Sequence, residues 1–197
     1  MVAFECIERT IPAMTEPSQK LMKAMLFAAK KHTDQRRKGE RAEPYVNHLI
    51  EVADLLATHT GGKNTDLICA GILHDTIEDT ATKHAELARE FGENVADIVQ
   101  ECTDDKSLPK QERKRLQIEH APHKSEEARM VKMADKISNL RSILDSPPPD
   151  WDAARKSEYF NWAKKVVDGC RGVNAGLEAE FDSTYAKGAK AFGIKAA

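Results

Sequence analysis

The sequence has few cysteines and aromatic residues, no long apolar run and almost no net charge. The longest apolar stretch, residues 67 to 73, contains a glycine and is far shorter than the ~20 residues of a membrane span. We therefore expect no membrane-spanning segment. No CxxC pair occurs, which argues against a zinc ribbon or a redox dithiol. The four cysteines are Cys6, Cys69, Cys102 and Cys170.

Charge of one sign is also lacking. Lysine and arginine number 30 against 32 acidic residues, which gives a formal net charge of −2. This balance argues against a surface built for nucleic acid or anionic membrane, so a bound polyanion would have to meet a local basic patch. Glu5 and Glu8 stand where a secretory signal would carry basic and then apolar residues, so we expect a cytoplasmic protein.

The length and composition are those of one globular domain. The chain has 197 residues, of which 41% are hydrophobic and 31% charged. We expect a single domain over residues 16–190, preceded by an N-terminal extension at 1–15. The sequence does not reveal the oligomeric state.

Apolar residues recur at helical spacing along most of the chain, and no segment alternates with the period of a strand. Pro44 is expected in the first turn of one helix, and Thr82 as the cap of another. The segment from 64 to 75 is apolar on all sides and should lie at the centre. The pattern predicts an all-α, single-domain helical bundle of about eight to ten helices. Their approximate ranges are 16–34, 44–60, 64–75, 83–91, 94–102, 109–120, 125–143, 151–167 and 174–187.

Four residues of metal-ligand type lie beside apolar residues of these predicted helices: His48, His74, Asp75 and Asp135. Polar groups so close to a core need partners. Imidazole nitrogen and carboxylate oxygen suit a catalytic divalent ion and leave coordination positions for water and substrate. A single buried histidine is more often just hydrogen-bonded, so the hypothesis depends on the four together.

The segment from His74 to Asp79 adds acid–base candidates. On a continuous helix, His74 and Glu78 are four residues apart, as are Asp75 and Asp79, so the four share one stripe. Carboxylates crowded there repel one another unless a cation lies among them; the alternative is a solvated acidic helix end. We expect Glu78 and Asp79 to position or deprotonate an attacking water, or to protonate a leaving group.

Four motifs, in this order, resemble the hydrolase domain of the RelA/SpoT alarmone enzymes, a branch of the HD-domain phosphohydrolases. They are Tyr45-Val-Asn-His48, His74-Asp75-Thr-Ile-Glu78-Asp79, Thr103-Asp-Asp-Lys106 and Lys132-Met-Ala-Asp135-Lys136-Ile-Ser-Asn139-Leu-Arg141. The similarity is closest to the stand-alone small alarmone hydrolases of the Mesh1 type and covers Leu21 to Leu177. It implies hydrolysis of the 3′-diphosphate of guanosine tetra- or pentaphosphate (ppGpp or pppGpp) to GDP or GTP and pyrophosphate, with bound manganese.

The resemblance also implies roles for individual residues. His48, His74, Asp75 and Asp135 match the family's metal ligands, and Glu78 and Asp79 its catalytic pair. The positions that match its substrate-binding residues are Arg37, Lys38, Lys110, Asn139, Ser142, Arg155 and Tyr159. One departure is Leu49, where the family usually has proline. A helix around His48 forms more easily without that proline, so we expect the ligand geometry to be kept.

A nucleotide with a diphosphate carries several negative charges, so a near-neutral protein that binds it needs a concentrated basic rim. Further candidates for this rim are Arg36, Arg41 and Lys106. The basic run from Arg113 to Arg115 is expected to be a solvated helix face instead.

Other functions stay open on the sequence alone. A related metal-dependent phosphatase could act on the 2′-phosphate of NADPH or on a nucleoside monophosphate, and a non-catalytic module could bind an alarmone without cleaving it. Direct nucleic-acid binding is disfavoured, because none of the usual modules is present. The side chains themselves would accept manganese, iron, cobalt or zinc.

Overall fold

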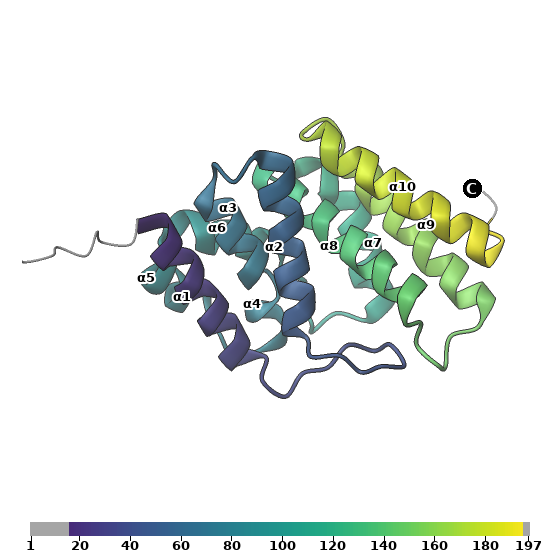
Figure 1. Ribbon diagram of the computed structural model, residues 1–197, viewed down its shortest axis with the longest axis horizontal. Helices are drawn as coiled ribbons and strands as arrows, with labels where there is room; N and C mark the ends of the chain where they lie inside the picture. The colour runs from purple at the N-terminus through teal and green to yellow at the C-terminus, as the bar shows by residue number, and fades with distance from the viewer. Residues whose placement is uncertain (1–15, 195–197) are drawn as a thin grey trace, which may run out of the picture.

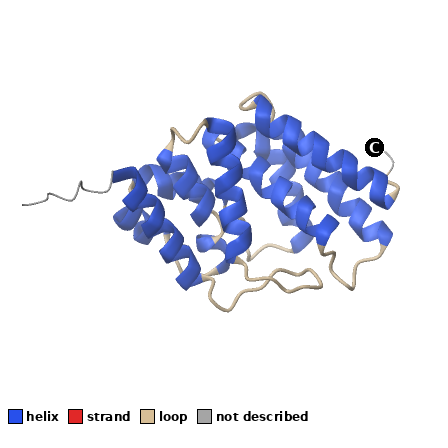
Figure 2. Ribbon diagram, viewed as in Figure 1, coloured by secondary structure: helices blue, strands red, loops and turns tan. Residues whose placement is uncertain are grey.

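The computed structural model describes residues 16–194, and this part of the chain is built of helices (Figure 1; Figure 2). It contains ten α-helices, one 3₁₀ helix and no strand beyond an isolated bridge between Arg36 and Pro44. This confirms the all-α bundle; the expected extension at residues 1–15 lies outside the described residues. The helices are α1 (Glu16–Lys31), α2 (Val46–Thr60), α3 (Thr65–Leu73), α4 (Thr76–Asp79), α5 (His84–Phe91), α6 (Glu93–Cys102), α7 (Lys110–His120), the 3₁₀ helix η1 (Ala121–His123), α8 (Glu126–Asp145), α9 (Ala153–Cys170) and α10 (Ala175–Phe192).

Helix α3 lies in the core, as its apolar sequence predicts. Every residue from Leu67 to Leu73 is buried, and the helix packs against α1, α2 and α6. Asn64 caps its first turn, because its side-chain oxygen accepts a hydrogen bond from the Leu67 amide at 3.0 Å. Since the helix is enclosed, the residues that follow its last turn enter the interior of the protein.

Helix α8 is the second element that positions polar groups inside the protein. It packs against α2, α9 and α10, and Figure 1 shows it between α2 and the α9–α10 pair. Ser125 caps its N-terminus by accepting a hydrogen bond from the Ala128 amide at 3.2 Å. Among its buried residues are Asp135 and Ser138, so α8 brings ionisable and hydroxyl groups into the core.

The sequence pattern was wrong about three helix boundaries. The apolar helix ends at Leu73 and α4 begins at Thr76, so the 74–79 segment is not one continuous helix. The Thr76 hydroxyl donates to the Leu73 carbonyl at 2.6 Å and thereby satisfies an acceptor at the end of α3. Pro44 precedes α2 instead of opening it, because its strand-like conformation pairs with Arg36. Thr82 does not cap α5; it is buried, and its hydroxyl pairs with that of Thr80.

No helix within residues 16–194 is long and apolar enough to cross a membrane. The three described cysteines, Cys69, Cys102 and Cys170, are buried free thiols, and Cys6 lies outside the described residues. Reduced thiols packed as small apolar side chains fit the absence of a dithiol motif.

The contact between α10 and α9 gives a test of packing. Gly188 lies against the fully buried ring of Phe160, and a Cβ at this position would overlap that ring. We expect Gly188→Ala to lower the free energy of unfolding by about 1–3 kcal/mol, measured by chemical denaturation. On an open helical site the same change stabilises by up to about 1 kcal/mol, so an increase in stability would contradict this packing. Because leucine at position 160 would make room for the added Cβ, Gly188→Ala should lower the free energy of unfolding less in the Phe160→Leu background than in the unchanged protein.

Candidate active site

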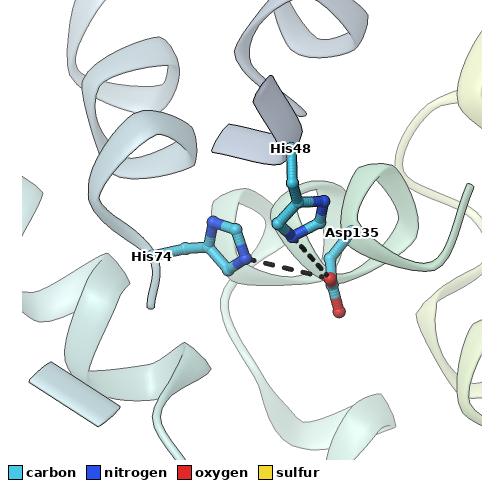
Figure 3. A group of neighbouring side chains, drawn as sticks. All are labelled: His48, His74 and Asp135. Atoms are coloured by element: carbon cyan, nitrogen blue, oxygen red, sulfur yellow. Dashed lines mark ion pairs between the residues drawn. The ribbon is translucent and has the colours of Figure 1, made fainter. Parts of the chain in front are cut away.

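Residues from three separate helical segments meet in the interior. His48 lies in the first turn of α2, His74 directly follows α3, and Asp135 lies in the middle of α8. Figure 3 shows both imidazole rings directing a nitrogen toward the same carboxylate oxygen. The Nε2 atoms of His48 and His74 lie 3.4 Å and 3.8 Å from Asp135 Oδ1.

The fourth predicted ligand, Asp75, joins the same cluster. Its Oδ2 lies 3.0 Å from His74 Nε2 and 3.7 Å from His48 Nε2. The Tyr45 hydroxyl donates a hydrogen bond to this oxygen at 2.6 Å. The break after α3 therefore places both His74 and Asp75 in the cluster, and all four residues singled out by sequence lie around one point.

The hydrogen-bond pattern of the histidines fits a cation. His74 Nδ1 faces the Gly71 carbonyl at 2.8 Å, and because a carbonyl only accepts, Nδ1 carries the proton. In the neutral ring Nε2 then bears a lone pair. The Nε2 atoms of His48 and His74 are buried without a hydrogen-bond partner and face carboxylate oxygens. Such an arrangement is unfavourable until a cation comes between the acceptors, so these residues fit a metal ion.

The pKa values reflect the same concentration of negative charge. Burial opposes a charge on His74, but the Asp75 and Asp135 carboxylates outweigh it and raise the pKa of His74 to about 10, so that without a metal ion a proton on Nε2 supplies the positive charge between these acceptors. Burial lowers the pKa of His48. Burial would also raise the pKa of Asp135, yet the neighbouring Lys136 ammonium helps to hold it well below its usual range. Lys136 Nζ lies 2.8 Å from Asp135 Oδ2, which leaves Oδ1 facing the histidines.

The two acid–base candidates lie near this cluster but have different partners. Glu78 accepts a hydrogen bond from the Asp104 amide at 3.0 Å, whereas Asp79 accepts one from Gln35 at 2.7 Å and pairs with Lys106. The prediction of one continuous helix from His74 to Asp79 was therefore wrong, because α4 is a separate turn, and these two carboxylates each have their own donors. Burial raises the pKa of Glu78, against the Asp104 hydrogen bond that lowers it.

A cavity of about 980 Å³ opens onto these groups. His74, Asp75, Glu78, Asp79 and Asp135 line it, and so does every residue expected to bind substrate. Those are Arg37, Lys38, Lys110, Asn139, Ser142, Arg155 and Tyr159. His48 instead lines a second, smaller cavity of about 130 Å³.

Arg37 and Asn139 connect the cavity wall to the cluster. The Arg37 guanidinium donates to Asn139 Oδ1 at 2.9 Å and lies 5.7 Å from the centre of the Tyr45 ring. The Asn139 amide in turn donates to Asp135 Oδ1 at 2.5 Å. One asparagine therefore contacts both the arginine at the wall and a carboxylate of the cluster.

Two cationic residues of α7 correct the expectation of a solvated helix face. Arg113 and Lys114 line the cavity, because α7 packs against α9 and Lys114 Nζ lies 5.1 Å from the centre of the Trp162 ring. Arg115 alone matches the expectation, since its side chain is 58% exposed and pairs with Glu112. Arg36 and Lys106 also line the large cavity, and Arg41 lines the small one.

Sequence reasoning missed three further groups at the cavity. The Tyr45 hydroxyl and the Lys136 ammonium each contact a carboxylate of the cluster, and both residues stand inside the motifs quoted above. Trp151 and Trp162 flank Tyr159 at ring distances of 5.4 Å and 5.2 Å and form an aromatic wall. Nothing in their spacing separates them from ordinary core aromatics.

Comparison with known proteins agrees with this geometry. A family model described as HD domain matches residues 24–160. The guanosine-3′,5′-bis(diphosphate) 3′-pyrophosphohydrolase MESH1 of Xenopus tropicalis is 47% identical over 172 residues, which cover 87% of this chain and 96% of the relative. The protein of the same name from Homo sapiens is 47% identical over 165 residues, 84% of this chain and 92% of the relative. A solved structure described as a metazoan ortholog of SpoT that hydrolyses ppGpp is 45% identical, has a TM-score of 0.84, and is matched over 88% of this chain and 98% of that chain.

The chain belongs to the HD domain family. Membership of this family of hydrolases implies a divalent metal ion, and the chain carries a histidine–aspartate group that could hold such an ion. Within that family it is of the MESH1 type, because the similarity extends over nearly the whole length of those relatives.

Metal binding to this cluster should stabilise the folded protein. An ion that binds only the folded state at about 100 times its Kd adds about 2.7 kcal/mol to the free energy of unfolding. We expect this gain when a divalent transition metal is added to chelator-treated protein, and its loss in Asp135→Asn. Thermal unfolding with and without metal measures it.

The matched control for this experiment is Asp97→Asn. Asp97 pairs with His84 at 2.7 Å on the surface, and its side chain is 66% exposed. This second histidine–aspartate pair should contribute nothing to the stabilisation. If Asp97→Asn abolished the gain while Asp135→Asn kept it, the ion would be bound at the surface instead of in the core.

Proposed function

We propose that this protein hydrolyses the 3′-diphosphate of guanosine tetra- or pentaphosphate to GDP or GTP and pyrophosphate, with Mn²⁺ as its metal. The observation that carries the proposal is the shared cavity. Three members of the histidine–aspartate cluster and the Glu78–Asp79 pair line it together with basic and aromatic residues; those three members are His74, Asp75 and Asp135. The relatives named MESH1 are called hydrolases of this nucleotide, and the chain matches nearly their whole length.

His48, His74, Asp75 and Asp135 would hold the ion. A divalent metal bound there would neutralise phosphate charge and lower the pKa of a water molecule. Two nitrogen and two oxygen donors accept Mn²⁺ as well as other transition metals, and manganese is the ion that the family resemblance implies.

Glu78 and Asp79 would move the protons of the reaction. Hydrolysis removes a proton from the attacking water and delivers one to the ribose 3′-oxygen of the leaving nucleotide. A carboxyl with a raised pKa, such as Glu78, exchanges protons more readily near neutral pH. Gln35 and Lys106 fix the Asp79 carboxylate in one orientation. The pair would therefore act on water and leaving group, without being ligands of the ion.

The opposite walls of the cavity would bind the nucleotide. The planar Arg37 guanidinium would stack on guanine, with Asn139 and Ser142 on the nucleoside side. Lys38, Lys110 and Arg155 would neutralise phosphate charge. Burial and the neighbouring cations Arg155, Lys114 and Lys38 lower the pKa of Lys110. Such a cluster of mutually repelling cations is expected at a site that binds an anion.

Product analysis tests the proposal. The protein is incubated separately with ppGpp, pppGpp, NADPH and nucleoside monophosphates, each with Mn²⁺ and with a chelator. Release of GDP or GTP and pyrophosphate only in the presence of Mn²⁺ is the expected result. Cleavage of NADPH or a monophosphate alone would indicate the related phosphatase, and binding of ppGpp without cleavage would indicate an alarmone-binding module.

The catalytic pair can be separated from the metal ligands by substitution. We expect Glu78→Gln and Asp79→Asn each to lower kcat by ~10²-fold or more, because general acid–base catalysis contributes ~10²–10⁴-fold. Metal content of the purified variants should stay near that of the unchanged protein. Metal loss in proportion to activity would mean that these carboxylates are ligands instead.

The guanine contact predicts a specific effect of Arg37→Lys. Lysine keeps the charge but cannot stack as a plane or reach Asn139 in the same geometry, so KM for ppGpp should rise about 10-fold. Arg41→Lys is the matched control, because Arg41 is 67% exposed and lines only the small cavity. Steady-state kinetics of both variants measure the difference; equal KM values would place the guanine away from Arg37.

A further inference from the structure

The second ring nitrogen of His48 contacts a chain of polar side chains outside the large cavity. His48 Nδ1 lies 2.8 Å from Ser138 Oγ, and that hydroxyl donates to Glu51 Oε2 at 2.6 Å. The other oxygen of Glu51 accepts a hydrogen bond from Arg141 at 3.1 Å, and Arg141 also pairs with Glu180 of α10. His48 and Ser138 are 3% and 1% exposed, so water does not compete freely at the first contact.

The direction of each hydrogen bond from His48 to Glu51 follows from the ion pair between Glu51 and Arg141. Glu51 is paired with Arg141, so its carboxylate is ionised and can only accept. Ser138 must therefore use its single hydrogen toward Glu51. The free lone pair of the Ser138 oxygen then accepts from His48, and Nδ1 of the neutral ring must carry the proton.

We propose that Ser138 and Glu51 are positioning residues for the metal site: together they hold His48 in the tautomer whose Nε2 lone pair faces Asp75 and Asp135. A nitrogen ligand needs that lone pair, and the partner of the other ring nitrogen decides which tautomer is present. The inference rests on the metal-binding part of the proposed function and assigns no contact between these two residues and substrate.

The two histidines differ in how this orientation is fixed. His74 uses the backbone carbonyl of Gly71, which no substitution at a side chain can remove. The tautomer of His48 depends on side chains from α8 and α2, so a side-chain substitution can remove the hydrogen bonds that fix it. The 130 Å³ cavity beside Ser138 and Glu51 would admit water to Nδ1 once the hydroxyl is removed. Water both donates and accepts, so it would leave the tautomer undetermined.

The experiment measures metal affinity and histidine tautomers without nucleotide. Mn²⁺ affinity is determined by competition with a chelator for the unchanged protein, Ser138→Ala and Glu51→Gln. We expect a loss of roughly 10–100-fold in Ser138→Ala, the range found when the outer partner of a ligating histidine is removed, and a smaller loss in Glu51→Gln. Long-range ¹H–¹⁵N spectra of the metal-free proteins should show His48 as the Nδ1–H tautomer, with a smaller population of it in Ser138→Ala.

Glu180→Gln is the matched control. It makes the same chemical change as Glu51→Gln and removes a partner of the same Arg141, but leaves the Ser138–Glu51 contact intact. Mn²⁺ affinity of Glu180→Gln should therefore equal that of the unchanged protein. If Ser138→Ala fails to fold, Glu51→Gln against Glu180→Gln decides the question alone.

Two results would overturn the inference: Mn²⁺ affinities of Ser138→Ala and Glu51→Gln equal to that of the unchanged protein, or His48 as the Nε2–H tautomer in the metal-free state. Neither measurement involves ppGpp. A protein whose Mn²⁺ affinity depends on Ser138 and Glu51 but that cleaves no alarmone would contradict the proposed activity and support the positioning role, so the two failures are distinguishable.

Discussion

The concentration of negative charge and acceptor atoms at His48, His74, Asp75 and Asp135, which requires a positive charge among them, is the constraint on which the rest of the site depends. Two imidazole nitrogens without hydrogen-bond partners face carboxylate oxygens in a region where the histidines are almost completely enclosed. Because the histidines are enclosed, water screens this negative charge only weakly, so neighbouring groups must limit it. Lys136 neutralises one side of Asp135, and the Tyr45 hydroxyl and Asn139 amide donate to oxygens of the two aspartates. The negative charge that remains is directed at one point, where a bound cation would be stabilised.

The fold accounts for the stability of such a polar centre. α3 is apolar on every side and α8 packs against α2, α3, α6, α9 and α10, so the backbone that carries the cluster is held by the core. Around it, charges of both signs line a single cavity, and the near-zero net charge of the chain conceals this local separation. A phosphorylated ligand therefore experiences a basic wall, although the protein as a whole is slightly acidic.

Periodicity and capping residues predicted the helices and placed nearly all their boundaries within a few residues, because amphipathic spacing reports burial directly. The cluster could also be predicted, since four ligand-type residues beside apolar runs are costly to bury unless they share a cation. Hydrogen bonds and contacts between distant segments could not be predicted from the sequence. The break after Leu73, the cavity-facing side chains of Arg113 and Lys114, and the contact from Ser138 to Glu51 depend on tertiary packing, which leaves no periodic trace in the sequence. The roles assigned to the individual residues stay predictions of the family resemblance and the geometry.

The distribution of the cluster along the chain has a consequence for biosynthesis. His48, His74 and Asp75 belong to the first half of the sequence, whereas Asp135 lies 60 residues beyond Asp75 on α8. During translation, two histidines and one aspartate of the cluster are therefore synthesised long before Asp135, whose carboxylate completes it. Only a chain that has packed α8 against α2 presents all four residues together, so binding of an ion by the full set would be coupled to this late long-range contact.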